Sequence, residues 1–169
     1  MDVETAIRTR RTHKSYGAEP VPRDTLLALL DLARFAPNHH VTQPWRFRVV
    51  GRDALTRLKE CAGESEAKKL GRAPTLIVAS ARLSGELVQD EEDLCATAAG
   101  IMLVLLAATD RGLASYWRTP AILRTARGRE ALGIPDGERV LGLLHFGAPA
   151  REPAARERSA VTQYVEFLP

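Results

Sequence analysis

The chain has 169 residues, which suits one domain, and its hydrophobic content of 45% is ordinary for a soluble globular protein. Its 24 basic and 21 acidic residues leave a formal charge of only +3, and 5% of the residues are aromatic, which argues against a nucleic-acid-binding surface. The two cysteines, Cys61 and Cys95, form no CxxC motif and no apolar leader follows Met1, so we expect a reduced, cytoplasmic setting without disulfides.

Capping residues and hydrophobic spacing predict the elements of the first half. Asp2 can cap a short helix that runs to about Thr9, and an amphipathic helix begins near Pro22 and ends before Pro37. The following elements are expected to be a strand from Trp45 to about Val50, a helix from Arg52 to about Ala62, an irregular or helical polar stretch over 63–72, and a buried strand over 73–81.

A long uncharged stretch dominates the second half. The acidic residues 90–93 are expected at a helix N-terminus, and the run from Leu94 to Thr109 carries no charge. This run falls short of the ~20 residues that cross a bilayer, and Gly112 supplies a helix stop, so no membrane span is expected. In a chain this small, a helix that is apolar on all sides needs covering by a partner, which predicts a homodimer.

The rest of the chain completes the fold prediction. A strand is expected over 113–118, a helix from Thr119 to Gly133, and a strong strand from Arg139 to Phe146. This order predicts a central sheet surrounded by helices, α+β in strict terms and α/β in the broad sense. We expect one domain over 1–169, with a tail from about 151 that packs on the partner subunit.

A cationic turn follows the first helix. Arg10, Arg11 and Lys14 supply cations and Thr12 a hydroxyl, a combination that suits a phosphate dianion. The alternative is a solvated helix end, where cations complement the negative dipole.

Four motifs together resemble the nitroreductase family of FMN-dependent enzymes, most of all its smallest bacterial members. They are the segment 10–16 (RRTHKSY), the pair Ala36-Pro37 followed by Gln43-Pro44-Trp45, the segment 112–119 (GLASYWRT), and the segment 140–149 (VLGLLHFGAP). The resemblance implies a nitroreductase-like central mixed sheet, a long buried central helix, and a homodimer with FMN at its interface.

The resemblance also implies a cofactor site. Arg10, Arg11, Thr12 and Lys14 match the turn that holds the FMN phosphate and ribityl chain. A loop that contains Pro37, Asn38, His39, His40 and Gln43 matches one that reaches the flavin of the other subunit. Many members have asparagine where this chain has Val41, which leaves His39 or His40 to replace that hydrogen bond.

A second part of the implied site lies in the strand and the tail. Trp117, Arg118 and Thr119 are expected beside the flavin ring, with Trp117 and Arg118 as the candidates for a role in catalysis. The alternative for Trp117 is a buried strand tryptophan. Arg156 or Arg158 could add a late phosphate contact, and a solvated tail is the alternative.

The expected activity is ping-pong electron transfer from NAD(P)H through FMN to a nitroaromatic, a quinone or a similar electron-poor acceptor. A non-catalytic flavin-binding or flavin-handling protein and a small nucleic-acid-binding domain are the rivals. The glycines show no G-x-G-x-x-G fingerprint, so the nicotinamide must bind transiently. The four histidines lack metal-binding spacing, and no metal is expected.

Overall fold

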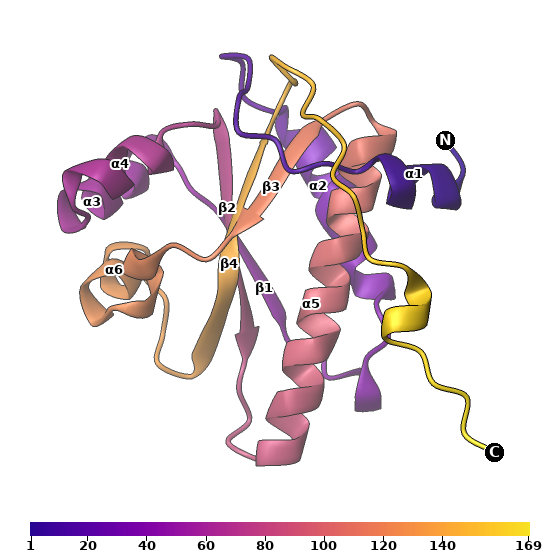
Figure 1. The fold of residues 1–169 in the computed structure, drawn as a ribbon. Coiled ribbons are helices and arrows are strands. Elements are labelled where there is room, and N and C mark those ends of the chain that lie inside the picture. Colours follow the sequence, from indigo (N-terminus) through magenta and orange to yellow (C-terminus); the bar gives the residue numbers. More distant parts are fainter.

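The computed structural model describes all 169 residues and shows an α+β fold built on one four-stranded sheet, as predicted (Figure 1). The strands are β1 (Trp45–Val49), β2 (Thr75–Arg82), β3 (Ala114–Arg118) and β4 (Glu138–Gly147), in the order β1-β2-β4-β3. All three strand pairs are antiparallel, so the expectation of a mixed sheet was wrong for these strands. The one parallel pairing is an isolated bridge between Thr12 of the cationic turn and Ser115 of β3. It involves a single residue of the turn.

Helices cover both faces of the sheet. Figure 1 shows α1 (Val3–Thr9), α2 (Arg23–Asp31) and the long α5 (Leu87–Asp110) on one side, and α3 (Arg52–Cys61), α4 (Glu64–Leu70) and α6 (Ala126–Ala131) on the other. A separate core fills each layer: Leu29, Ile101 and Phe146 belong to the first, and Leu58 and Leu143 to the second. Central strand β2 therefore buries both of its faces.

Helix α5 begins earlier than the sequence suggested. Its first residue is Leu87, one turn before the acidic cluster 90–93. The Asp90 carboxylate instead accepts hydrogen bonds from the backbone N–H groups of Ser84 and Gly85, which fixes the loop that enters the helix. Gly112, with φ of 69°, follows the end of the helix, as expected for a left-handed stop.

The segment expected to be one helix, 119–133, contains two short ones. A 3₁₀ helix spans Ala121–Arg124, and α6 follows it. Thr125 separates them, because its side-chain oxygen accepts a hydrogen bond from the Gly128 N–H and so caps a new helix.

A single chain covers only part of α5, and burial of the remaining face by a partner stays a prediction. Residues on its inner face, such as Ile101, Val104 and Ala108, are fully buried. Cys95 is exposed, and the neighbouring outer face is half-buried and uncharged: Ala98, Ala99, Met102, Leu103 and Leu106. By length and composition α5 could cross a membrane, but its inner face forms part of the sheet core, as in the central helix of a soluble domain.

Candidate functional site

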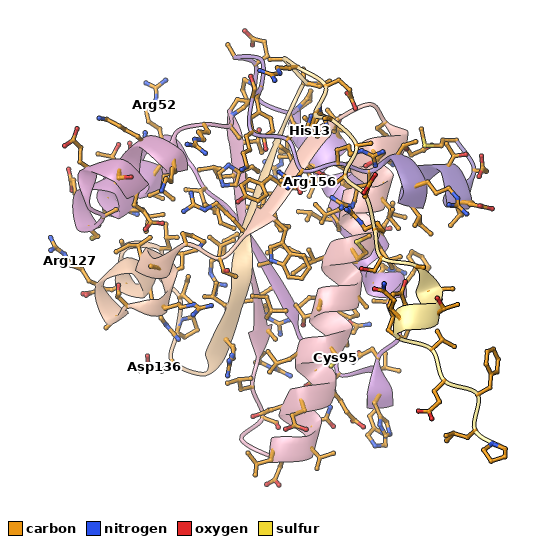
Figure 2. All side chains as sticks on the ribbon, in the orientation of Figure 1. His13, Arg52, Cys95, Arg127, Asp136 and Arg156 are labelled. Atoms are coloured by element: carbon orange, nitrogen blue, oxygen red, sulfur yellow. The ribbon has the colours of Figure 1, made fainter.

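A cavity of about 690 Å³ lies where the C-terminal tail crosses the N-terminal cationic turn. Its lining consists of Arg10, Arg11, Thr12, Lys14, Ser15, Tyr116, Arg151, Pro153, Ala154, Arg156 and Arg158. Six of these side chains are cationic, three carry a hydroxyl, and none is a carboxylate. Figure 2 shows Arg156 of the tail near His13 of the turn. We call this site the cationic cavity.

Backbone hydrogen bonds hold the turn in place. The His13 N–H donates to the carbonyl oxygen of Ser115 at the start of β3, at 3.0 Å. The Gly17 N–H donates to Ala148 at 2.9 Å, just beyond the end of β4. The cationic turn therefore rests on the edge of the sheet, and the tail that leaves β4 passes beside it.

The positive charges of the cationic cavity have no acidic partners. None of its six cations belongs to an ion pair in the structure. Arg11 donates only to the backbone carbonyl oxygens of Arg8 and Arg10. Burial lowers the pKa of Arg10, and the charges of Arg158 and Arg11 lower it further. Arg158 thus comes close to Arg10 from the other end of the chain.

This arrangement suits a phosphate ester. Guanidinium groups and hydroxyls on a fixed turn form short, charge-assisted hydrogen bonds with phosphate oxygens. The predicted residues Arg10, Arg11, Thr12, Lys14 and Arg158 all line the cavity, so the structure brings this part of the predicted site together. The residues present therefore fit the phosphate end of FMN.

Among the polar lining residues, three had no predicted role in the site. Ser15 and Tyr116 belong to motifs that carried the resemblance but had no assigned role, whereas Arg151 belongs to the tail that was expected to pack on the partner subunit. The presence of Ser15 beside the other turn residues was the only available signal. Arg151 could not be found from spacing, because more than 130 residues separate it from the turn.

The loop over 38–43 is strained and attached to α5. His40, Val41 and Gln43 have φ values of 52°, 52° and 46°, in the left-handed region that residues with a side chain rarely adopt. Three non-glycine residues in this region cost several kcal/mol in total, at about 1–3 kcal/mol each, and such strain often marks a functional segment. The Asn38 side chain accepts a hydrogen bond from the Gln43 N–H at 2.6 Å, which holds the loop shape.

Two contacts anchor this loop near the start of α5. The Thr42 hydroxyl donates to the buried carboxylate of Asp93, and His39 Nδ1 lies 3.0 Å from Glu92. The Gln43 side chain is exposed, as are Pro37 and His40.

The loop and the cationic cavity lie near opposite ends of α5. Asp93 holds the loop, whereas Asp110, at the other end, binds the amino group of Met1 at 2.8 Å. The two residues are 17 positions apart, which corresponds to about 25 Å of helix. No residue of the loop lines the cationic cavity of its own chain.

The structure places the residues predicted to flank the flavin ring outside the cationic cavity. Trp117 packs against the core beside α5, and its Nε1–H donates to the Leu141 carbonyl oxygen at 3.0 Å. Arg118 points to the other face of β3, where its guanidinium lies 2.7 Å from the Glu66 carboxylate of α4. Thr119 is exposed beyond the strand. These contacts are those expected of the structural alternative for Trp117, and the flavin contacts of all three residues remain predictions.

A buried histidine lies behind the site. His145 of β4 is 1% exposed, neither ring nitrogen has a hydrogen-bond partner, and its ring lies near those of Tyr16 and Tyr116. Burial, followed by the charges of Arg118 and Arg72, lowers the pKa of His145 to about 4. The imidazole is therefore neutral near pH 7 and acts as part of the core.

Comparison with known proteins identifies the family. The family model described as "Nitroreductase family" matches residues 7–148. A Bacillus subtilis protein named "Putative NAD(P)H nitroreductase YfhC" is 30% identical over 172 residues, covering 92% of this chain and 88% of that protein.

Solved structures agree on the fold. A nitroreductase-like family protein from Bacillus cereus superposes with a TM-score of 0.91 at 26% identity, over 99% of this chain and 96% of that one. A Desulfovibrio desulfuricans protein solved in complex with FMN has a TM-score of 0.82 at 24% identity, over 99% and 98% of the two chains. The chain belongs to the nitroreductase family.

Proposed function

We propose that this protein is an FMN-dependent oxidoreductase that takes electrons from NAD(P)H and passes them to a nitroaromatic, a quinone or a similar electron-poor small molecule by a ping-pong mechanism. When bound, FMN supplies the ring that accepts a hydride and then gives up electrons. The residues of this chain bind and orient the reactants.

The observation that carries the proposal is the set of unpaired cations in the cationic cavity. Arg10, Lys14 and Arg158 would hold the phosphate, with Thr12 as an additional hydroxyl donor. Because neighbouring cations and burial already lower the pKa of Arg10, an anion at this position relieves an unfavourable arrangement of charge. Sequence relatives named as NAD(P)H nitroreductases and a neighbour solved with FMN support the same cofactors.

We infer a homodimer in which each flavin contacts both subunits. Within one chain, the loop over 38–43 lies too far along α5 to reach the cationic cavity. A second copy packed on the uncharged outer face of α5 would cover that face and could bring its loop toward the cavity. Asn38, His39, His40 and Gln43 would then serve the partner's flavin, and Pro37 would help to position the loop.

The first experiment is an absorption spectrum of the purified protein with added FMN, recorded before and after anaerobic addition of NADPH. We expect flavin binding and rapid loss of the oxidised flavin absorbance. Binding without bleaching would support the flavin-handling alternative. Failure to bind FMN would contradict the proposed site.

A second experiment tests the phosphate site. Arg10→Ala and Lys14→Ala should each weaken FMN binding on the order of tenfold or more, because each removes a charge-assisted hydrogen bond of about 1.5–3 kcal/mol. Riboflavin should bind the native protein poorly, since it lacks the phosphate. Arg52→Ala is the matched control and should leave FMN affinity unchanged, because Arg52 lies at the exposed start of α3, does not line the cavity, and is well apart from Arg156 in Figure 2. Equal affinity for FMN and riboflavin would show that the turn does not bind phosphate.

A further inference from the structure

The cationic cavity carries more positive charge than one phosphate can balance. It presents six cations and no carboxylate. A phosphomonoester carries a charge of about −1.5 to −2 at pH 7, so a bound FMN phosphate would leave about four positive charges uncompensated. Like charges held around one cavity repel each other, and a second anion would stabilise the arrangement.

The positions of these cations divide them into two sets. Arg10, Arg11 and Lys14 belong to the turn, and Arg158 is near enough to Arg10 to affect its pKa. Arg151 and Arg156 come from the tail, and neither is part of an ion pair or donates a side-chain hydrogen bond. Their guanidinium groups are therefore available for another ligand.

We propose that Arg151 and Arg156 bind the 2′-phosphate of NADPH and thereby make the enzyme prefer NADPH to NADH, an inference that rests on the proposed FMN-dependent function. The two reductants differ only in this phosphomonoester. Arginine is suited to it because the planar guanidinium donates two parallel hydrogen bonds to phosphate oxygens. A volume of about 690 Å³ lies within the range of cofactor-sized sites and leaves room beside a flavin phosphate.

No local pattern in the sequence marks a basic site for the ribose phosphate. The cluster exists only after the tail has folded back across the turn. The exposed setting of Arg151 and Arg156 also means that salt should weaken the selectivity.

A binding measurement on the FMN-loaded protein tests this assignment without relying on turnover. Calorimetric titration should show that adenosine 2′,5′-bisphosphate binds on the order of tenfold more tightly than adenosine 5′-diphosphate at low salt. Arg151→Ala and Arg156→Ala should each reduce this difference several-fold, and the corresponding lysine variants should restore part of it. Arg127→Ala, an exposed cation on α6, is the control and should preserve the difference.

Steady-state kinetics supply the second measurement. Each alanine variant should raise the KM for NADPH and leave the KM for NADH and the FMN dissociation constant unchanged. If Arg151→Ala and Arg156→Ala instead weaken FMN binding and affect both reductants equally, the tail cations serve the flavin phosphate and the inference is wrong.

The inference and the proposed function fail in different ways. A wild-type enzyme that binds FMN and is bleached equally well by NADH and NADPH would overturn the inference alone. A protein that binds no FMN would overturn both.

Discussion

The indole of Trp117 occupies a space left for it by Gly142. A Cβ atom added at Gly142 would lie 2.3 Å from the indole nitrogen, which itself hydrogen-bonds to Leu141. We expect Trp117→Phe, which removes the donor, to lower the free energy of unfolding by about 1–2 kcal/mol. Trp117→Ala should lower it by about 3 kcal/mol or more, because it also leaves a cavity against the core. Urea denaturation measures both changes.

A control separates this structural role from a role in acceptor selection. Trp45 is also half-buried, but its indole donates no hydrogen bond within the chain, so Trp45→Phe should cost less than Trp117→Phe. If Trp117→Ala retains native stability and changes the relative rates with small and bulky quinones, the tryptophan faces the substrate.

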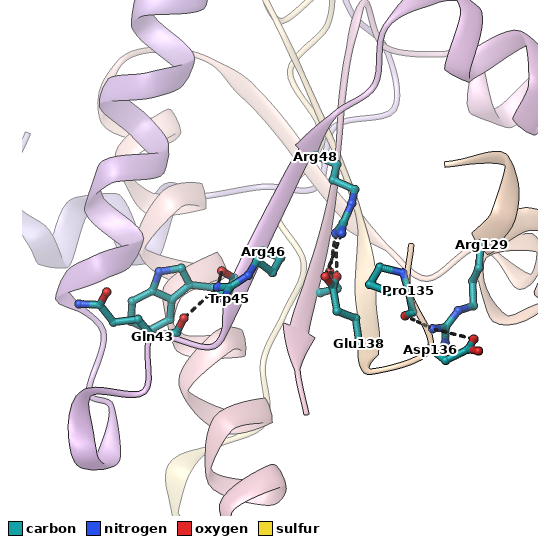
Figure 3. Close-up of polar contacts among 9 residues, drawn as sticks. Gln43, Trp45, Arg46, Arg48, Arg129, Pro135, Asp136 and Glu138 are labelled. Atoms are coloured by element: carbon teal, nitrogen blue, oxygen red, sulfur yellow. Dashed lines mark hydrogen bonds and ion pairs between the residues drawn. The ribbon is translucent and has the colours of Figure 1, made fainter. Parts of the chain in front are cut away.

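The ion pair between Arg48 and Glu138 links β1 to β4 across β2 (Figure 3). Two guanidinium nitrogens lie 2.7 and 2.8 Å from the carboxylate, and the Ser80 hydroxyl also donates to it. Burial by itself raises the pKa of Glu138, but the hydrogen bonds from Arg48 and Ser80 and the charge of Arg48 outweigh it and lower the pKa overall.

This lowered pKa has a predictable effect on stability. The ionised carboxylate makes its full contribution to the free energy of unfolding at pH values above its unfolded-state pKa of about 4.3. That contribution is lost as the pH falls through the lower folded-state pKa. Glu138→Gln should therefore lower the free energy of unfolding by about 1–3 kcal/mol at pH 7, with a smaller difference from wild type below about pH 4. Urea denaturation at several pH values tests this, with the exposed Glu60→Gln as a control. A difference that grows on acidification would contradict the assignment.

At the scale of elements, α6 depends on a glycine for its close approach to the preceding 3₁₀ helix. A Cβ atom at Gly128 would lie 2.1 Å from the Ile122 carbonyl oxygen. Alanine favours helices by about 1 kcal/mol over glycine, but this clash with backbone should reverse the sign and make Gly128→Ala destabilising by about 1–3 kcal/mol. Thermal unfolding measures the change. Gly137→Ala, where a Cβ meets nothing within 4 Å, should have little effect, and a stabilised Gly128→Ala would refute this packing.

For the whole molecule, the C-terminal tail is expected to pack on a second copy. Tyr164, Val165, Phe167 and Leu168 are all exposed within one chain, with Phe167 at 93%. Figure 1 shows the tail end leaving the body of the subunit. Deletion of residues 159–169, which retains Arg158, should weaken the dimer, because the partner subunit then loses its contacts with these apolar side chains.

Sedimentation equilibrium at micromolar concentration measures this effect. A double serine substitution at Phe167 and Leu168 should act in the same direction, whereas Val49→Ser, on the exposed side of edge strand β1, should not. An FMN-loaded protein that remains a monomer, or a truncated protein with unchanged dimer affinity, would overturn the proposed interface.

Local physical signals allowed most elements to be predicted from the sequence. Asp2 does cap α1, and the apolar runs around Ile77 and Leu143 do form central strands. The two errors in element bounds arose where side chains act locally in an unexpected way. Asp90 lies in the first turn of α5, as expected, but binds the preceding loop, and the helix starts three residues earlier. Thr125 begins a second helix where only one was expected.

The sequence by itself determined the α+β class and the cationic turn, because these depend on periodicity, capping and residues close together in the chain. Its four motifs indicated the family through their resemblance to known members. Only the tertiary structure decided strand direction, what Trp117 and Arg118 contact on their respective faces of β3, and the position of the tail. Arg151, Arg156 and Arg158 meet Arg10 because β4 ends beside the turn and the chain then crosses it. Contacts between residues so far apart in sequence depend on the path of the whole chain, and no local pattern records that path.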